Sequence, residues 1–382
     1  MRKIAFFSLT PSPPAPPANQ KTLEALKAAY PDSQIDEFYI LPLLKNAPLA
    51  MLTAAGVAGV TYAPDLLRGH KKFKYAAFRT PWVFDWIKQQ AGKLIDPEQY
   101  AFTFQMQSLF DASVKGVPHF IYTDHTHLEN LNFEDFDPSA LYSKGWIDCE
   151  KTIYQNATTV FTRSSNVSAS LEDQYQCGAD KIRCVYAGSN AAAPTTPMPT
   201  PDRYSQKNIL FAGVDWIRKG GPTLLAAFQK ILPRHPDASL TIVGCSPDIG
   251  QTPQCKVVGR VPLEEMPKWY EEASVFCLPT RVEPFGIVFV EAMWQSLPIL
   301  ATRVGAVPDM VIDSLNGFLI QPGDVDALAN RLDTILNDQT MRADMGNAGR
   351  QLAEDRYDWS AVANRMRKHI HEQLNTCDAQ SS

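Results

Sequence analysis

The first half of the chain alternates short apolar runs with longer stretches in which apolar residues recur at helical spacing. Runs of strand length occupy residues 3–8, 34–39, 100–105, 119–122, 159–162 and 182–186, and a helical pattern at 23–29 follows the first of them. Strands that alternate with helices pair in parallel, because each crossover returns the chain to the same end of the sheet. Residues 1–188 are therefore predicted to form a doubly wound α/β domain.

The second half repeats this rhythm. Strands are predicted at 208–212, 239–243, 256–258, 275–278 and 298–301, and helices at 222–232, 263–272 and 285–295. Residues 189–206 begin with many prolines and small side chains, which predicts a linker. We expect a second Rossmann-like domain over 207–356, and then a helix within 357–382 that crosses back to the first domain and ends in a loose tail. Ligands in such folds bind beyond the carboxyl ends of strands, so the domains are expected to face a central cleft.

Two apolar segments raise the question of a membrane span or a leader. The first apolar run is too short for a signal peptide and is predicted to be the first strand. The stretch from Asn46 to Pro64 carries no charge, but it is rich in Ala, Gly and Thr and too weakly apolar to span a bilayer. We expect a buried helix there.

Two glutamates, Glu283 and Glu291, stand on either side of a Pro-Phe-Gly turn that joins a predicted strand to a predicted helix. The free N–H groups at a helix start bind phosphate without a basic side chain. With a helix from Phe285, Glu291 lies about 8 Å along the axis, close to the span from a diphosphate to a ribose. One glutamate is then placed to hold a sugar and the other the ribose. Glutamates at a helix start also occur simply as charges that favour the dipole, and that interpretation stays open.

Two adjacent cations, Arg218 and Lys219, precede a predicted helix whose first residue is Pro222. Arg offers a planar fork and Lys a mobile point charge, a combination suited to a diphosphate. An isolated Arg-Lys pair is more often a solvated feature of a surface loop. A second helix start on the same sheet edge favours the anion site.

A set of motifs in the second half resembles the retaining GT-B glycosyltransferases of the "glycosyl transferases group 1" family, family four of the carbohydrate-active classification. In chain order they are Arg218-Lys219-Gly220-Gly221, Val243-Gly244, Gly259-Arg260-Val261, Glu283-Pro284-Phe285-Gly286 with Glu291-Ala292-Met293, the run 301–308, and Gly317-Phe318-Leu319 with Pro322-Gly323-Asp324. The resemblance covers about residues 207 to 340. It implies two Rossmann-like domains and transfer of a hexose from a nucleotide diphosphate sugar.

The resemblance also implies residue roles. Arg218 and Lys219 would bind the donor diphosphate, Glu283 would contact the sugar hydroxyls, and Glu291 would hold the ribose. The segment Pro284, Phe285, Gly286 and Ile287 would face sugar and phosphate, and Gly259, Arg260 and Val261 would lie against the base. Retention by front-face attack without a bound metal or a cofactor is implied, because no carboxylate is placed as a double-displacement nucleophile. A UDP-hexose is favoured over a GDP-hexose as the donor, and a saccharide, a lipid or a small molecule would be the acceptor.

The first domain resembles the family less closely. The family has a Gly-Gly loop after the first strand, and this chain has a proline-rich loop from Pro11 to Pro17. His125 follows a predicted strand at the place where many members present a catalytic histidine, so it is identified as a catalytic candidate. His125 and His127 could alternatively be metal ligands on one strand face, but no third ligand is evident. Other readings of the whole chain are a nucleotide-sugar epimerase and a non-catalytic sugar-nucleotide-binding subunit.

Composition and charge restrict the partners. With 382 residues, 45% of them hydrophobic, the chain can form two cores, and its net charge of -5 gives no electrostatic reason to expect nucleic acid. Seven scattered cysteines suit reduced thiols in a cytoplasm. One local stretch is basic and interleaved with aromatics, which suits peripheral contact with the inner face of a membrane or an anionic acceptor. The alternative is a solvated helix with its aromatics in the core. The cations of this basic stretch are Arg68, Lys71, Lys72, Lys74 and Arg79.

Overall fold

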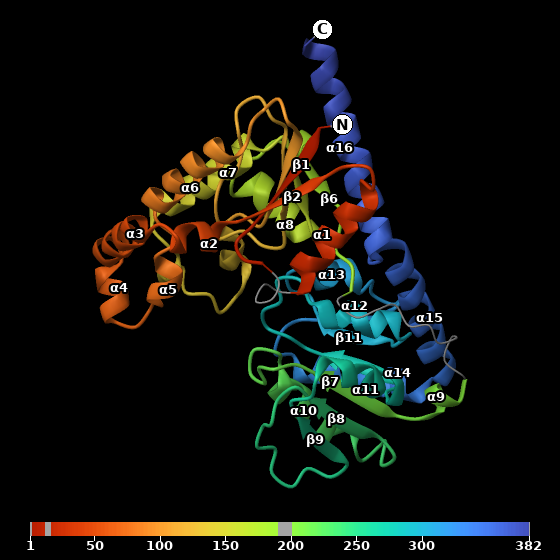
Figure 1. The fold of residues 1–382 in the computed structure, drawn as a ribbon. Helices are drawn as coiled ribbons and strands as arrows, with labels where there is room; N and C mark the ends of the chain where they lie inside the picture. Colours follow the sequence, from red (N-terminus) through yellow and green to blue (C-terminus); the bar gives the residue numbers. More distant parts are fainter. Residues whose placement is uncertain (1, 12–16, 190–200, 382) are drawn as a thin grey trace. The chain divides into compact units, whose positions relative to one another are not determined.

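The computed structural model describes residues 2–11, 17–189 and 201–381. Its contacts divide the chain into two compact units, Met1–Ala187 with Trp359–Ser382, and Gly188–Asp358. Residues 12–16 of the proline-rich loop and 190–200 of the expected linker lie outside the described residues. Each unit is an α/β layer structure with its own sheet (Figure 1).

Unit 1 contains a six-stranded parallel sheet with the order β2-β1-β3-β4-β5-β6. Its strands are β1 (Lys3–Ser8), β2 (Ile35–Tyr39), β3 (Tyr100–Met106), β4 (His119–Thr123), β5 (Thr159–Thr162) and β6 (Ile182–Cys184). Its helices are α1 (Pro17–Ala29), α2 (Ile40–Lys45), α3 (Pro48–Thr61), α4 (Ala63–Leu67), α5 (Phe73–Ala76), α6 (Pro81–Leu94), α7 (Lys144–Asn156), α8 (Ser165–Asp173) and α16 (Trp359–Ser381). Short 3-10 turns are η1 (Leu128–Asn132), η2 (Pro138–Ala140) and η3 (Ala179–Lys181).

The core of this sheet is aromatic. The rings of Phe6, Phe104 and Phe161 stack in succession with centroids 6.1 and 6.4 Å apart, and Phe120 stacks on Phe161 at 6.0 Å. All four are buried. A slip of one residue would move a phenylalanine to the opposite face, so the rings fix the strand register.

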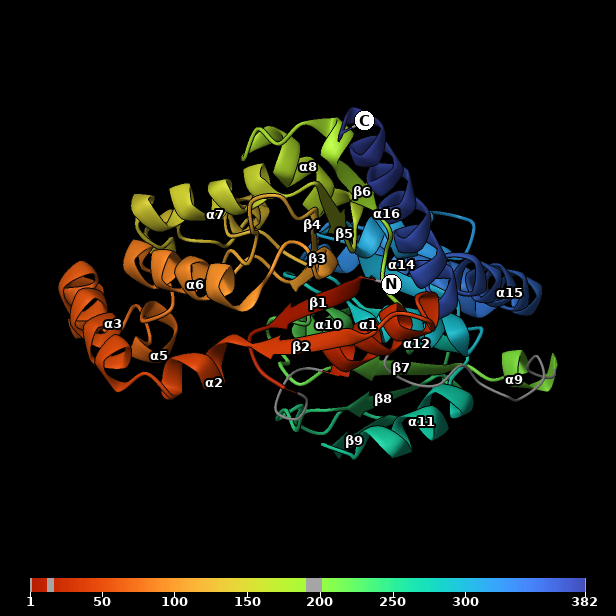
Figure 2. The same cartoon turned by 45° about the horizontal axis from the view of Figure 1, so that its top comes forward.

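Helix α16 completes unit 1 from the far end of the chain. It lies against α1, and Ala363 packs with Ala25 and Ala29 between the two helices. Small residues let the two backbones approach closely. Both views show the N-terminal part of α16 beside α1 (Figures 1 and 2).

Unit 2 contains a second six-stranded parallel sheet with the order β12-β11-β10-β7-β8-β9. Its strands are β7 (Asn208–Ala212), β8 (Ser239–Val243), β9 (Cys255–Gly259), β10 (Val275–Leu278), β11 (Ile299–Thr302) and β12 (Gly317–Ile320). Its helices are α9 (Pro201–Ser205), α10 (Gly221–Ile231), η4 (Leu263–Glu265), α11 (Met266–Glu272), α12 (Ile287–Trp294), α13 (Val307–Met310), α14 (Val325–Asn337) and α15 (Gln339–Arg356). The predicted parallel α/β architecture is confirmed in both units.

The expectation of a buried helix between Asn46 and Pro64 is wrong. The segment is helical as α3, but only the stripe Ala50, Ala54 and Ala58 is buried. Leu49 and Val60, on the other face, are 79% and 83% exposed. Apolar composition predicted burial on all sides, whereas the structure supplies neighbours on one side only. Among the described residues, no helix is both long and apolar enough to cross a bilayer.

Candidate functional site

The loop after β7 meets the loop after β10 at the carboxyl edge of the unit 2 sheet. Gly220 has a φ of +74°, and a Cβ there would lie 1.8 Å from the carbonyl oxygen of Pro279. Only glycine tolerates both the left-handed backbone and this close approach. The amide of Arg281 also donates to the carbonyl of Arg218, at 2.8 Å. Two segments about sixty residues apart are thereby joined at the backbone.

The same contact brings together Lys219 and Glu283. The Lys219 ammonium donates to Glu283 Oε2, and the two residues are 8% and 5% exposed. A buried charge requires a partner, because leaving water is costly for either ion alone. The resemblance implied that Lys219 binds a diphosphate and that Glu283 contacts a sugar. The structure unites these two candidates as one ion pair.

Arg218 is placed differently from its neighbour. Its Nη1 donates to the carbonyl of Val282 at 3.0 Å, and its Nε lies 3.6 Å from Asp215 Oδ2. More than a third of its side chain is exposed. Arg218 therefore lies beside the buried pair and keeps a solvent-facing cation at the same edge of the sheet.

The helix after the Pro-Phe-Gly turn begins at Ile287, two residues later than predicted. Gly286 has a φ of +92° and occupies the N-cap, and a Cβ there would lie 2.7 Å from the ring of Phe289. The left-handed glycine delays the helix, because it turns the chain before the first helical residue. Glu291 is therefore about 6 Å along the axis from the first helical residue, shorter than the predicted 8 Å.

Glu291 lies in a different environment from Glu283. It is largely buried, and its Oε2 accepts a hydrogen bond from the Tyr270 hydroxyl at 2.9 Å. Burial raises the pKa of the Glu291 carboxyl, and the Tyr270 hydrogen bond only partly opposes that change. Tyr270 was not predicted as a site residue. Its predicted helix was correct in place, but nothing in its pattern indicated which residue meets the glutamate.

The segment expected against the base lies at the carboxyl end of β9, the last strand of the sheet. Gly259 has a φ of +83°, and its carbonyl accepts from the amide of Gly244 at 2.8 Å. Arg260 is exposed and Val261 is half-buried. This arrangement leaves both side chains accessible at the carboxyl edge of the sheet.

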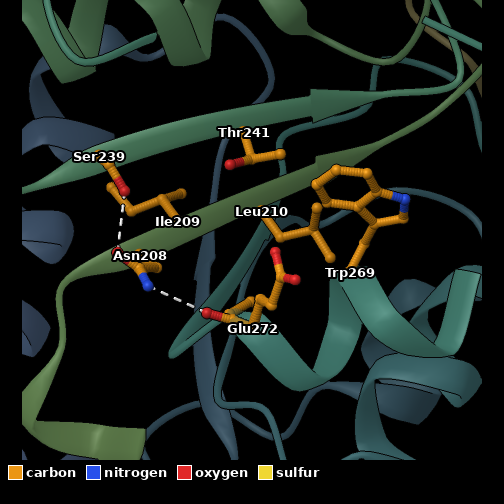
Figure 3. A pocket seen from close by; sticks show the side chains of 8 residues that line it. Asn208, Ile209, Leu210, Ser239, Thr241, Trp269 and Glu272 are labelled. Carbon is orange, nitrogen blue, oxygen red and sulfur yellow. Dashed lines mark hydrogen bonds between the residues drawn. The ribbon is translucent and has the colours of Figure 1, made fainter. Parts of the chain in front are cut away.

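A small pocket elsewhere in unit 2 does not contain the predicted residues. It has a volume of about 90 Å³ and lies between the first residues of β7 and β8 and the end of α11 (Figure 3). Asn208 crosses it to accept from Ser239 Oγ and to donate to the Glu272 carbonyl. These strand positions are at the amino edge of the sheet, and the volume is far below the roughly 300 Å³ of a small-molecule site. The pocket is therefore not a candidate donor site.

In unit 1, His125 lies just beyond the carboxyl end of β4. Its carbonyl accepts from Thr123 Oγ1 at 2.8 Å, and its ring stacks on Phe133 with centroids 6.4 Å apart. Nδ1 is buried and makes no hydrogen bond. Burial lowers the pKa of His125, so the imidazole is neutral near pH 7. The ring is held by packing and offers a neutral imidazole nitrogen.

His127 has a structural role. Its Nε2 accepts from the amide of Tyr142 at 2.8 Å, and its own amide donates to Glu150 at 3.1 Å. Burial lowers the pKa of His127 to about 4. Glu150, which the sequence analysis missed, also accepts from the hydroxyls of Tyr154 and Tyr175. This buried carboxylate anchors the loop that carries His125. A single glutamate on an amphipathic helix is common, so the sequence did not indicate this role.

Two members of the predicted basic patch are not available on the surface. The Lys71 ammonium is buried, 2.6 Å from Asp65 Oδ2. The Arg79 guanidinium is half-buried over the Tyr142 ring, 4.7 Å from its centroid, and donates to the Tyr75 carbonyl. Local folding after α4 turns these two cations inward, where carboxylate, carbonyl and aromatic groups compensate them. The expectation of an exposed set of five cations is wrong for Lys71 and Arg79.

Part of the chain is similar to known proteins in sequence. Residues 200–352 match the family model described as glycosyl transferases group 1. A GDP-mannose-dependent alpha-(1-6)-phosphatidylinositol monomannoside mannosyltransferase of Mycolicibacterium smegmatis is 33% identical over 166 residues, which cover 39% of this chain and 44% of that protein. A D-inositol 3-phosphate glycosyltransferase of Corynebacterium efficiens is 25% identical over 64% of each chain. The chain thus spans less than two thirds of the length of these relatives.

Solved structures match over nearly the whole chain. Sucrose-phosphate synthase from Thermosynechococcus elongatus superposes with a TM-score of 0.65 at 20% identity, covering 99% of this chain and 100% of that one. Anabaena Alr3699/HepE, in complex with UDP and glucose, gives a TM-score of 0.61 at 16% identity over 97% and 100% of the two chains. At such identities the likeness shows the fold alone. Residues 200–352 are thus similar to the glycosyl transferases group 1 family, and the two parallel α/β units have the GT-B fold.

Proposed function

We propose that this protein is a retaining glycosyltransferase that moves a hexose from a nucleotide diphosphate sugar to a saccharide, lipid or small-molecule acceptor. The observation that carries the proposal is the buried Lys219–Glu283 pair beside the start of α12. The Arg218 cation and the helix N-terminus at this sheet edge suit an anionic diphosphate, and the Glu283 carboxylate suits neutral sugar hydroxyls. The match of residues 200–352 to the glycosyl transferases group 1 model supports glycosyl transfer.

Different residues of unit 2 would bind different parts of the donor. Lys219, Arg218 and the free N–H groups at Ile287 would bind the diphosphate and stabilise the charge that develops as it leaves. Glu283, held by Lys219, would accept hydrogen bonds from the sugar hydroxyls. Glu291 would accept from the ribose hydroxyls through the oxygen that Tyr270 does not use.

No resident metal or cofactor is part of this proposal. The Arg218 cation and the α12 dipole, with the Glu283-paired Lys219 ammonium beside them, would stabilise the leaving diphosphate. Its phosphate oxygen would take the proton of the acceptor hydroxyl, which attacks the anomeric carbon from the face that the phosphate leaves. Configuration at that carbon is then retained.

His125 is the proposed catalytic residue of unit 1. A neutral imidazole can brace positive charge at the sugar by donating or accepting a hydrogen bond without adding a like charge. His125→Gln should lower kcat about a hundredfold, in line with the loss of one placed polar group, and leave nucleotide affinity unchanged. His369→Gln, in α16, is the matched control. A His125 variant with full turnover would remove this residue from the mechanism.

The names of the relatives guide the choice of substrates. A UDP-hexose is the proposed donor, and a GDP-hexose is the competing one because two relatives are described as GDP-mannose-dependent. The same names suggest an inositol phosphate or a phosphatidylinositol mannoside as acceptors to try. Contact with an anionic surface is kept as a proposal for Arg68, Lys72 and Lys74, the exposed cations of the basic stretch.

A donor panel tests the function. UDP-, GDP- and ADP-linked hexoses are added to the protein, and thermal stabilisation and release of nucleoside diphosphate are measured with and without acceptors. A donor at 100 times its dissociation constant should stabilise the protein by about 2.7 kcal/mol. Lys219→Ala should abolish release, and Lys230→Ala, a change in an exposed lysine of the same unit, should not. NMR of the product should show retained configuration.

Two other outcomes would replace the proposal. Conversion of the donor to its epimer without any acceptor would identify an epimerase. Donor binding with no chemistry for any acceptor would indicate a sugar-nucleotide-binding subunit. Inversion at the anomeric carbon would overturn the front-face mechanism while leaving the transferase.

A further inference from the structure

The exposed face of α3 is an apolar surface with no charged residue. Leu49, Leu52, Gly56 and Val60 follow one another at spacings of three and four, so they share a face opposite the buried alanines. Leu49, Leu52 and Val60 are 79%, 70% and 83% exposed. Isolated exposed leucines are ordinary, but a whole helix face of large apolar side chains marks an interaction surface.

The apolar surface continues into the next two helices. Leu67 at the end of α4 is 89% exposed, and Phe73 and Tyr75 of α5 are each 48% exposed. Figure 1 shows α3, α4 and α5 at one side of unit 1, and Figure 2 shows α3 and α5 at the same side, beyond α2 and α6. These helices therefore form one projecting part of the unit, which we call the α3–α5 surface.

Cations accompany these apolar side chains. Arg68, Lys72 and Lys74 are exposed in the segment between α4 and the end of α5, and Lys45 is exposed just before α3. From Ile40 to Phe84 the sequence contains a single acid, Asp65. Asp65 is the partner of buried Lys71, so its charge is already compensated. The exposed charge of the surface is positive only.

We propose that the α3–α5 surface docks this protein onto an anionic lipid bilayer. The inference builds on the proposed function, whose acceptor class includes lipids, and it gives the basic stretch a defined partner surface. Helix α3 is about 21 Å long by its 14 residues, too short to span the hydrocarbon core, so it would lie in the interface. Its leucines would enter the headgroup boundary while lysines and arginine meet lipid phosphates.

Charge complementarity selects the bilayer over other occupants. A second copy of this chain would present the same cations, so a symmetric contact through this face would bring like charges together. An apolar protein partner would not require a face that excludes acids. A lipid surface offers hydrocarbon and anions in one plane, which matches leucines and lysines on one side of a unit.

Vesicle binding by the full chain tests the proposal. Flotation is measured with vesicles of phosphatidylcholine alone and of phosphatidylcholine with about a third phosphatidylserine, at low and high salt. We expect binding to the anionic vesicles that falls as salt rises. Leu49→Ser with Leu52→Ser, and separately Lys72→Gln with Lys74→Gln, should each weaken it about tenfold or more.

Matched variants separate this surface from general effects. Leu263→Ser with Leu315→Ser changes two exposed leucines of unit 2, and Lys93→Gln with Lys115→Gln removes the same charge elsewhere in unit 1. Both should bind vesicles like the wild type. All altered side chains are exposed, so folding should persist, and donor-induced thermal stabilisation checks that it does.

Three results would overturn the proposal. One is equal binding to neutral and anionic vesicles, a second is indifference to the α3 and α5 substitutions, and a third is loss of a dimer in the leucine variant by sedimentation, which would assign the face to a second copy. The donor panel is independent of vesicles. Transfer without vesicle binding would reject only the docking surface, and vesicle binding without transfer would reject only the proposed function.

Discussion

Glu283 and Glu291, eight residues apart around one turn, show how two identical side chains acquire different properties. Glu283 ends in the buried ion pair with Lys219, whose ammonium comes from another loop. Glu291 is less deeply buried, and its described hydrogen-bond partner is the uncharged Tyr270 hydroxyl. Burial raises the pKa of Glu291. The residue type is the same, so the surroundings decide what each carboxylate can do.

The two glutamates suit different parts of a donor. A carboxylate already matched with an ammonium is held in place and shares its charge, which suits positioning of neutral sugar hydroxyls. A carboxylate without a cation keeps its full acceptor strength toward a ribose. Substitutions at the two glutamates and at their partners test this difference.

Breaking the ion pair on one side should have the largest effect. Glu283→Ala leaves the Lys219 ammonium buried without a partner, and we expect a loss of about 3 to 5 kcal/mol of stability, measured by urea denaturation. Replacing both members by apolar residues, Lys219→Met with Glu283→Leu, should recover most of that loss while transfer stays absent. A single variant as stable as the wild type would mean that the pair is not buried in solution.

Removing only the charge of Glu291 should affect binding more than stability. Glu291→Gln keeps an oxygen for Tyr270 but weakens the bonds offered to a ribose. Nucleoside diphosphate affinity should fall about tenfold, equal to about 1.4 kcal/mol, in calorimetric titration. The matched change is Glu272→Gln, a glutamate at the end of α11. Unaltered affinity in Glu291→Gln would show that Glu291 does not bind the ribose.

Removing the hydroxyl that contacts Glu291 should have a smaller effect. Tyr270→Phe deletes one hydrogen bond and leaves the ring packed, so we expect a loss of about 1 kcal/mol in urea denaturation. In Glu291→Gln the same tyrosine substitution should cost less, because the bond is then neutral. Equal losses in the two backgrounds would show that the hydroxyl and the carboxylate do not interact.

The pH dependence of stability should give the smallest signal. The folded pKa of Glu291 is above 4.5, so its contribution to stability is full below about 4.5 and is lost as pH rises through the folded value. Glu150 and Glu129 shift in the same direction, so the difference between the wild type and Glu291→Gln must be followed. We expect that difference to fall with rising pH. A rising difference would contradict the burial of Glu291.

Much of the fold could be predicted because its signals are local. Strand β10 occupies the predicted residues 275–278, and β7 occupies the predicted 208–212, since each is a short apolar run bounded by turn residues. Helix boundaries were less accurate. The start of α12 moved by two residues because the backbone angle of Gly286, and not the apolar pattern, sets where the helix begins.

Contacts between distant segments could not be predicted in the same way. Lys219 and Glu283 are 64 residues apart, and the pair forms because a glycine allows two loops to touch. Nothing in the sequence around Glu150 indicated that it would hold the loop of His125. Lys71 and Lys72 are adjacent and chemically identical, yet one is buried against Asp65 and the other is exposed.

The two parallel α/β units could be predicted from the chain alone, because hydrophobic periodicity and turn residues are local properties of the sequence. The pairing of Glu283 with Lys219, the contact of Glu291 with Tyr270 and the exposure of the apolar face of α3 became visible only in the folded protein. Burial and charge pairing depend on what lies across from a side chain, and that neighbour is set by packing between segments far apart in the chain.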